Sequence, residues 1–153
     1  MSNCYPTHGI VVDDERVNLE MIAFLLHRTG FKRIARFPDA EGALAYVLEH
    51  GADLIISDLE MAPMNGLAFL RAVRSDPGLR SVPFLMMTAS LDEAAWKSSI
   101  ESGATEFLFK PLSANGFREA ISTCLDLAPP PRRLVRETAW RGRDGSRAAP
   151  CQT

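Results

Sequence analysis

Short runs of β-forming residues alternate five times with longer stretches of helical period along this chain. Two strands that are joined through a helix are parallel, because a parallel pair needs a long crossover connection, and such crossovers are right-handed. The alternation therefore predicts an α/β fold with a doubly wound, five-stranded parallel sheet and helices on both of its faces. We expect strands at 9–12, 33–37, 53–57, 83–87 and 106–109, and helices at 16–29, 40–50, 66–75, 91–102 and 114–127.

Apolar stripes and capping residues support the predicted helices. The first and last helices carry apolar residues at i, i+4 and i+7 or i+8, a spacing typical of a helix face that packs on a core. Asp39 is placed to cap the second helix, and Ser90 with Glu93 forms a capping-box pattern for the fourth. The apolar stripes are Val17, Met21, Phe24 and Leu25 in the first helix, and Phe117, Ile121, Cys124 and Leu125 in the last.

The composition is that of an ordinary globular protein, with 46% hydrophobic and 24% charged residues in a chain of 153. A net charge of −2 indicates neither nucleic acid nor a membrane as a partner. Three widely separated cysteines form no disulfide or metal-binding pattern, so a reducing cytoplasm is the simplest location. No apolar run is long enough for a signal peptide or a membrane span.

The composition changes after residue 127. Residues 128–153 contain a triple proline at 129–131 and six arginines against two acidic residues, so this segment carries +4 and the rest of the chain −6. Arg, Gly and Pro replace the apolar periodicity there. We therefore expect a domain over residues 1–127 and a flexible Pro/Arg-rich tail over residues 128–153.

Charged and hydroxyl side chains follow four of the five predicted strands. Asp13 and Asp14 follow the first strand, Asp58 the third, Thr88 the fourth and Lys110 the fifth. In a doubly wound sheet, ligands bind outside the carboxyl ends of the strands, so these residues should converge. Any one of them alone is most simply a turn or cap residue, and it is their co-occurrence that indicates a site.

The chemistry of such a site follows from its charges. Three converging carboxylates repel one another unless a cation lies among them, and Mg²⁺ prefers carboxylate oxygens and often bridges to phosphate. Lys110 and Thr88 suit the oxygens of a phosphoryl group during its transfer. A carboxylate can itself attack phosphorus to form an aspartyl phosphate, and Asp58 is best placed to do so.

The motifs "VVDDE", "LIISDLEMAPMNG", "FLMMTAS" and "FLFKPL" resemble, in order and strand context, the receiver domain of bacterial two-component response regulators. The run "VDDERVNLEMIAFLLHRTGF" agrees with it. The resemblance covers about residues 8–127 and is strongest to the short, stand-alone chemotaxis-type regulators. It implies the flavodoxin-like strand order 2-1-3-4-5 and a Mg²⁺ cofactor.

The resemblance also implies roles for individual residues. Asp58 would accept a phosphoryl group from a phosphohistidine on a sensor histidine kinase or a histidine phosphotransfer protein. Asp14 and Asp58, with the backbone carbonyl of Glu60, would ligate Mg²⁺, and Asp13 would act through a bound water. The protein would then catalyse its own phosphorylation and dephosphorylation rather than act as a multiple-turnover enzyme.

Signalling in this family is a shift between two conformations. Lys110 would pair with Asp58 and then with the phosphoryl oxygens, across a Lys110–Pro111 bond that is expected to be cis. Thr88 would move toward the phosphoryl group, and Phe107, three residues before the lysine, either follows as a switch residue or is a core residue only.

The resemblance also implies where the signal is read out. The fourth helix, fifth strand and fifth helix would present it to a downstream protein target, with phosphorylation-dependent dimerisation as a further expectation. Trp96 in the fourth helix is either a packing residue or an anchor for that partner.

Two features depart from the family pattern. The family commonly has Pro four residues after the phosphoacceptor, where this chain has Ala62 followed by Pro63. Glu60 and Ser90 stand at positions expected to flank the path of the attacking water. Glu60 is therefore either a residue that tunes the lifetime of the phosphoryl group or a solvated carboxylate in a turn.

Two other functions use similar residues. A phosphohydrolase of the haloacid dehalogenase type also needs a nucleophilic Asp, a Thr, a Lys and Mg²⁺, but its nucleophile follows the first strand and its second acid is an Asp. A receiver-like interaction module would keep the fold without being phosphorylated. DNA binding is not expected from this chain alone, because a tail of 26 residues is too short for a DNA-binding domain of the usual size.

Overall fold

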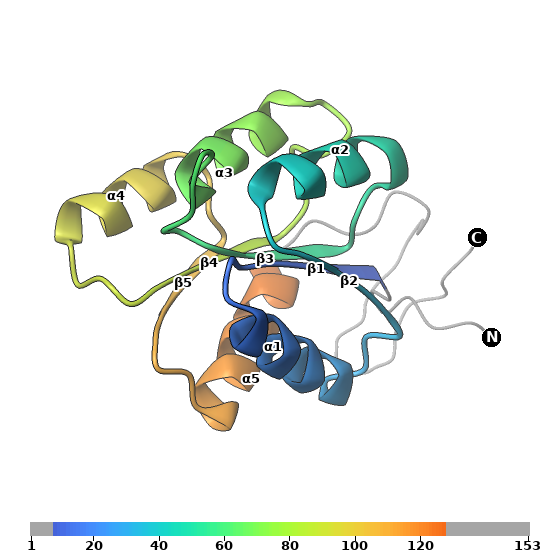
Figure 1. The fold of residues 1–153 in the computed structure, drawn as a ribbon, viewed down its shortest axis with the longest axis vertical. Helices are drawn as coiled ribbons and strands as arrows, with labels where there is room; N and C mark the ends of the chain where they lie inside the picture. The colour runs from blue at the N-terminus through green and yellow to red at the C-terminus, as the bar shows by residue number, and fades with distance from the viewer. Residues whose placement is uncertain (1–7, 128–153) are drawn as a thin grey trace. The chain divides into compact units, whose positions relative to one another are not determined.

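The computed structural model describes residues 8–127. They form a parallel five-stranded sheet whose consecutive strands are connected through helices (Figure 1). The order of the strands is β2-β1-β3-β4-β5, which confirms the predicted doubly wound topology. The predicted tail, residues 128–153, lies outside the described residues. The strands are β1 His8–Val12, β2 Arg33–Phe37, β3 Leu54–Asp58, β4 Phe84–Thr88 and β5 Glu106–Phe109; the helices are α1 Arg16–Arg28, α2 Ala40–His50, α3 Gly66–Ser75, α4 Glu93–Glu101 and α5 Ala114–Leu127.

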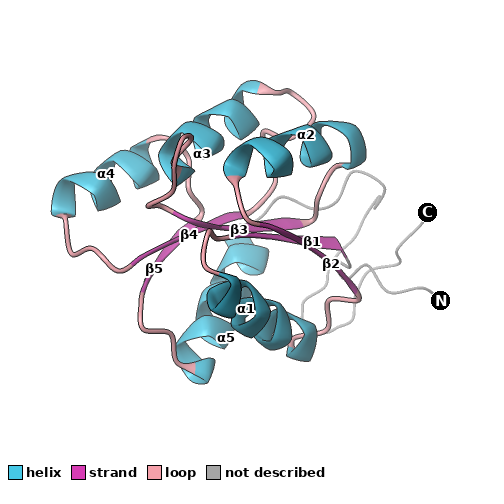
Figure 2. Ribbon diagram, in the orientation of Figure 1, coloured by secondary structure: helices cyan, strands magenta, loops and turns pink. Residues whose placement is uncertain are grey.

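The helices cover the sheet on both faces: α2, α3 and α4 on one, α1 and α5 on the other (Figure 2). Side chains of a strand point alternately to the two faces. Ile55 of β3 accordingly packs in the cluster with α2 and α3, whereas Leu54 and Ile56 pack in the cluster with α1 and α5. All five residues of β3 are buried, so the central strand is held from both sides.

Strands β3 and β4 each begin and end one residue later than the sequence predicts, so each is extended at its carboxyl end. Asp58 and Thr88 are therefore the last residues of their strands rather than the residues that follow them. Backbone hydrogen bonds cause the extension, because the N–H of Leu59 donates to Met87 (2.7 Å) and the N–H of Lys110 to Thr88 (2.8 Å). Both side chains are thus held by the sheet itself and not by a loop.

The predicted cap of the fourth helix was wrong. Helix α4 begins at Glu93, and its N-cap is Asp92, whose side chain accepts a hydrogen bond from Ala94 N at 3.0 Å. Ser90, two residues before this N-cap, instead accepts from Asp92 N at 3.1 Å. Ser and Asp are both favoured N-caps, so the spacing alone could not separate them. The cap that Asp39 was predicted to form on α2 is confirmed.

The predicted core face of the first helix was also wrong. Val17 and Phe24 are 79% and 59% exposed, and α1 packs through a second stripe that has equally helical spacing, namely Leu19, Ile22, Ala23 and Leu26. The sheet selects this stripe, because Gly9 in β1 leaves room for Leu26: a Cβ atom on Gly9 would lie 2.7 Å from its Cδ2. We call the exposed residues Val17, Met21 and Phe24 the α1 stripe.

A polar cluster surrounds His8, the first residue of β1. It lies at the amino ends of the strands, opposite the carboxyl ends that carry the acids. Arg33 donates to His8 Nδ1 at 2.9 Å, which leaves Nε2 as the protonated nitrogen that meets the Tyr46 hydroxyl at 2.8 Å. Asp53 accepts a hydrogen bond from His8 N at 3.0 Å. Burial lowers the pKa of His8, the charge of Arg33 lowers it further, and Asp53 only partly opposes this, while His50 lowers it slightly. His8 is therefore neutral in the folded protein.

The lowered pKa of His8 makes the stability of the protein depend on pH. His8 binds a proton more readily in the unfolded chain than in the folded protein. The neutral His8 therefore contributes to the free energy of unfolding above pH 6.5, its ordinary pKa, and this contribution is lost as the pH falls toward the pKa of His8 in the folded protein. Urea unfolding between about pH 7.5 and about pH 5 should show that the wild type loses on the order of 1 kcal/mol more than His8→Gln, which cannot titrate. Equal losses in the two proteins would contradict this assignment.

Candidate functional site

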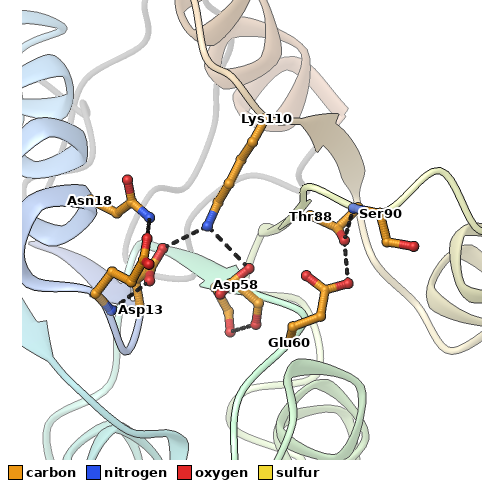
Figure 3. Close-up of polar contacts among 9 residues, drawn as sticks. Asp13, Asn18, Asp58, Glu60, Thr88, Ser90 and Lys110 are labelled. Carbon is orange, nitrogen blue, oxygen red and sulfur yellow. Dashed lines mark hydrogen bonds and ion pairs between the residues drawn. The ribbon is translucent and has the colours of Figure 1, made fainter.

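Two buried carboxylates and a lysine meet at the carboxyl ends of the central strands (Figure 3). Lys110 Nζ donates to Asp13 Oδ2 at 3.0 Å and lies 3.3 Å from Asp58 Oδ1. Asp13 is fully buried and Asp58 is 4% exposed, whereas Asp14 is exposed. The predicted convergence of these four residues is therefore present in the structure.

Backbone contacts fix the direction of the Asp13 side chain. Asp13 continues the β1 ladder by donating its N–H to Phe37 O at 3.1 Å, and its Oδ1 accepts from Glu15 N at 2.9 Å. This leaves Oδ2 of Asp13 to face the lysine. The Lys110–Pro111 bond is cis, as expected, and Ala62–Pro63 is cis as well.

Gly66 allows helix α3 to begin directly against the phosphoacceptor candidate. A Cβ atom at this position would lie 2.3 Å from the carbonyl oxygen of Asp58 and 2.9 Å from Cα of Leu59. Because both neighbours are backbone atoms, no side-chain movement could relieve the overlap. The N–H of Gly66 donates to Leu59 O at 2.9 Å, which ties the start of α3 to the end of β3.

The electrostatics of the site oppose full ionisation of its acids. Burial, followed by the charge of Asp13, raises the pKa of Asp58 to about 6, although Lys110 partly opposes the shift and Glu60 adds to it. Burial alone would lower the pKa of Lys110, but its hydrogen bond to Asp13 and the charge of Asp58 outweigh this and raise it. Lys110 is thus firmly protonated, and the carboxylates still lack positive charge.

The residues fit a hard divalent cation. Asp13, Asp14 and Asp58 each offer a carboxylate oxygen, and these oxygens all lie within 4.8 Å of one another. Among the described residues, the buried Oδ1 of Asp58 has only the ion pair with Lys110 Nζ at 3.3 Å, so it keeps a lone pair for a cation. Mg²⁺ takes such oxygen ligands and would supply the missing positive charge. The grouping does not rank Asp14 above Asp13 as the direct ligand, so that part stays a prediction.

Thr88 and Glu60 are in direct contact, which the sequence reasoning missed. The Thr88 hydroxyl donates to Glu60 Oε2 and accepts from Ser90 N at 2.9 Å. The sequence predicts a metal-binding backbone carbonyl for Glu60, and a side chain that either tunes the lifetime of the phosphoryl group or is a solvated carboxylate in a turn. The available signal was that Asp58 and Thr88 end neighbouring strands, which brings the residues just after β3 beside the end of β4.

The two aromatic candidates, Phe107 and Trp96, belong to β5 and α4. Phe107 is 9% exposed and belongs to the core cluster that also contains residues of α2 and α3, with its ring centroid 5.3 Å from that of Phe109. It therefore has a core role, and its switch role stays a prediction. Trp96 is 40% exposed. Leu91 before α4, Ile100 in α4 and Phe109 in β5 are exposed apolar residues as well, and we call Leu91, Trp96, Ile100 and Phe109 the α4–β5 patch.

The family of this chain follows from its sequence match. The sequence model of the response regulator receiver domain family matches residues 10–122 of this chain. The chain belongs to this family. It is a receiver domain of the two-component response regulator type, as the site geometry leads one to expect, and Mg²⁺ binding and phosphorylation are typical of the family. The alternative of a dehalogenase-type phosphohydrolase is therefore set aside.

Individual relatives support the same assignment. The chain is 32% identical over 112 residues to the "Probable chemotaxis protein CheY" of Rhizobium etli, which covers 73% of this chain and 87% of the relative. It is 37% identical over 102 residues to the DNA-binding response regulator MtrA of Mycobacterium tuberculosis, covering 67% of this chain but only 43% of that protein. The solved structure of chemotaxis response regulator CheY4 of Vibrio cholerae superposes with a TM-score of 0.73 at 27% identity, over 79% of this chain and all of that one.

The sequence predicts no membrane-spanning segment, and the helices of the described residues agree with this. No helix within 8–127 combines the length and the apolar character needed to cross a membrane.

The raised pKa of Asp58 predicts that this residue destabilises the metal-free receiver. The folded protein prefers the protonated acid, so its stability falls as the pH rises from 3.8 through about 6. Asp58→Asn, which keeps an oxygen for Lys110, should stabilise the protein above pH 6 by up to about 3 kcal/mol, the free energy that corresponds to the shift from 3.8 to about 6.

Urea unfolding in EDTA, compared at acidic and neutral pH, measures this gain. The gain should shrink as the pH falls, and Mg²⁺ should stabilise the wild type but not Asp58→Asn. A variant that is less stable than the wild type at neutral pH would contradict the electrostatic account.

Proposed function

We propose that this receiver is a phosphoacceptor response regulator in which Asp58 takes a phosphoryl group from the phosphohistidine of a sensor histidine kinase or a phosphotransfer protein. One observation carries the proposal. Asp58 ends the central strand as a buried carboxylate whose Oδ1 has one polar partner among the described residues, Lys110 Nζ at 3.3 Å. Such an oxygen is available as a nucleophile and is already paired with the charge that a transferred phosphoryl group needs.

The chemistry is a single transfer. A carboxylate oxygen of Asp58 attacks phosphorus, the P–N bond to the donor imidazole breaks, and its electron pair stays on the imidazole nitrogen, which then binds a proton. Lys110, held by Asp13, stabilises the charge that spreads over the phosphoryl oxygens. A bound Mg²⁺, held by Asp13, Asp14, Asp58 and by the carbonyl of Glu60 that the family predicts, would supply further charge neutralisation. Hydrolysis of the acyl phosphate returns Asp58 to its carboxylate form.

The α1 stripe supports a docking place for the phosphodonor. Helix α1 begins at Arg16, two residues after Asp14, so Val17 lies next to the acidic edge and the stripe runs away from it. Exposed apolar residues gathered in this way mark interaction surfaces. A donor helix that packs on the stripe would bring its phosphohistidine toward Asp58.

The α4–β5 patch supports the predicted surface for the downstream target. Trp96 and Ile100 of α4 are 40% and 41% exposed, and Phe109 of β5 is 42% exposed. Phe109 immediately precedes Lys110 in the chain, and its ring contacts Phe107. The patch is therefore connected to the site through neighbouring residues of β5 and Lys110.

Phosphorylation with a small donor tests the central proposal. The protein, incubated with acetyl phosphate and Mg²⁺, should gain the mass of one phosphoryl group, whereas Asp58→Asn and an EDTA control should not. No addition to the wild type would favour the interaction module that is not phosphorylated. Addition that persists in Asp58→Asn would show that Asp58 is not the acceptor, and sustained turnover of the donor would favour a phosphohydrolase.

Docking on the α1 stripe predicts a loss that depends on the donor. Val17→Ser and Phe24→Ser should lower the rate of transfer from a phosphorylated sensor kinase roughly tenfold or more, because each removes an exposed apolar contact. Their reaction with acetyl phosphate should stay unchanged. Leu48→Ser, at a residue that is 55% exposed on α2, is the matched control. Equal effects on both donors, or an equal loss in the control, would argue against the stripe.

A further inference from the structure

We propose that Glu60 is a displaceable latch on Thr88. In the unphosphorylated protein the Glu60 carboxylate holds the hydroxyl hydrogen of Thr88, and a phosphoryl group on Asp58 must displace that carboxylate before Thr88 can contact it. Glu60 is thus a positioning residue that acts through Thr88. The inference rests on the proposed function, because it concerns the residue that would meet the phosphoryl group.

The hydrogen-bonding capacity of Thr88 makes the two contacts exclusive. A threonine hydroxyl has one hydrogen to donate. In the structure Thr88 donates it to Glu60 Oε2, while the oxygen accepts from Ser90 N at 2.9 Å (Figure 3). A phosphoryl oxygen is an acceptor, so it can bind the Thr88 hydroxyl only if Glu60 gives up the same hydrogen.

The backbone around Glu60 holds it beside Thr88 and leaves only its side chain free to leave. Leu59 and Met61, on either side, are 7% and 8% exposed and belong to the core cluster. Leu59 also donates to Met87 O at 2.7 Å and accepts from Gly66 N at 2.9 Å. Glu60 itself is exposed, so its carboxylate can be released into water without being buried elsewhere.

The charge of the phosphoryl group supplies the force for displacement. Glu60 is already one of the charges that disfavour the carboxylate of Asp58. The phosphoryl group of an aspartyl phosphate carries roughly two negative charges in place of the single charge of the carboxylate, and it adds three strong acceptor oxygens to the same side chain. Repulsion of Glu60 and attraction of the Thr88 hydroxyl therefore act in the same direction.

Binding of beryllofluoride in the presence of Mg²⁺, a stable mimic of the phosphoryl group, tests the latch. Glu60→Ala should bind it about tenfold more tightly than the wild type, because no hydrogen bond to a charged acceptor has to be broken first. Glu60→Gln keeps an acceptor oxygen without the charge and should stay closer to the wild type. If charge repulsion alone were responsible, Gln and Ala would show the same gain.

A double-mutant cycle separates the latch from other effects of Glu60. In a Thr88→Val background, which has no hydroxyl to hold, Glu60→Ala should change the affinity for beryllofluoride by less than about twofold. A gain of the same size in both backgrounds would overturn the latch. The latch would also be overturned if the wild type bound beryllofluoride and Glu60→Ala bound it with the same affinity.

Hydrogen exchange gives a second measurement that needs neither metal nor phosphoryl group. Release of Thr88 should loosen its contact with Ser90 N, so the Ser90 amide should exchange faster in metal-free Glu60→Ala than in the wild type. Glu60→Gln should restore slow exchange. Unchanged exchange at Ser90 would overturn the latch, whereas a wild type that takes up neither beryllofluoride nor a phosphoryl group would overturn the proposed function instead.

Discussion

Repulsion between buried carboxylates is the constraint on which the site depends. Asp13 and Asp58 are almost without solvent and face each other across one lysine, so the folded protein holds an excess of negative charge where water cannot screen it. The cost appears in the raised pKa of Asp58. Because the buried carboxylates repel one another, they favour binding of a cation, which brings positive charge. They also favour a reaction that uses the electron pair of one carboxylate, as a nucleophile does.

The sheet maintains this unfavourable arrangement because it controls all the positions at once. β3 lies between β1 and β4, so Asp58 has the acids of one neighbour on one side and Thr88 of the other neighbour on the other. β5 places Lys110 one strand further, where only a long side chain can reach the acids. The two helical layers bury the strands from both faces, and hydrophobic burial thereby offsets the electrostatic cost.

The sequence was sufficient where a pattern allows one physical solution. The alternation of strands and helices indicates a doubly wound parallel sheet, and the resemblance to receiver domains implies its strand order. Residues at the carboxyl ends of parallel strands must converge, so the fold and the placement of Asp58 and Lys110 could be predicted. It was insufficient where two solutions fit the same pattern. Helix α1 has two apolar stripes, and only the recess at Gly9 of β1 shows which one packs. The hydrogen bond between Glu60 and Thr88 depends on a rotamer and on the path of a loop, neither of which has a period to read.

The loop that follows β3 is closed by the hydrogen bond between Gly66 N and Leu59 O. Its two ends therefore meet at one point, and Met61 in the core and Asn65, which caps α3, hold the stretch between them. Ala62 and Pro63 are exposed, so they can change without moving either the strand before or the helix after. This makes the tip of the loop a variable part of the fold. Evolution, or a designer who substitutes these two residues, can alter the surface that a partner meets while the phosphoacceptor candidate stays where the sheet has placed it.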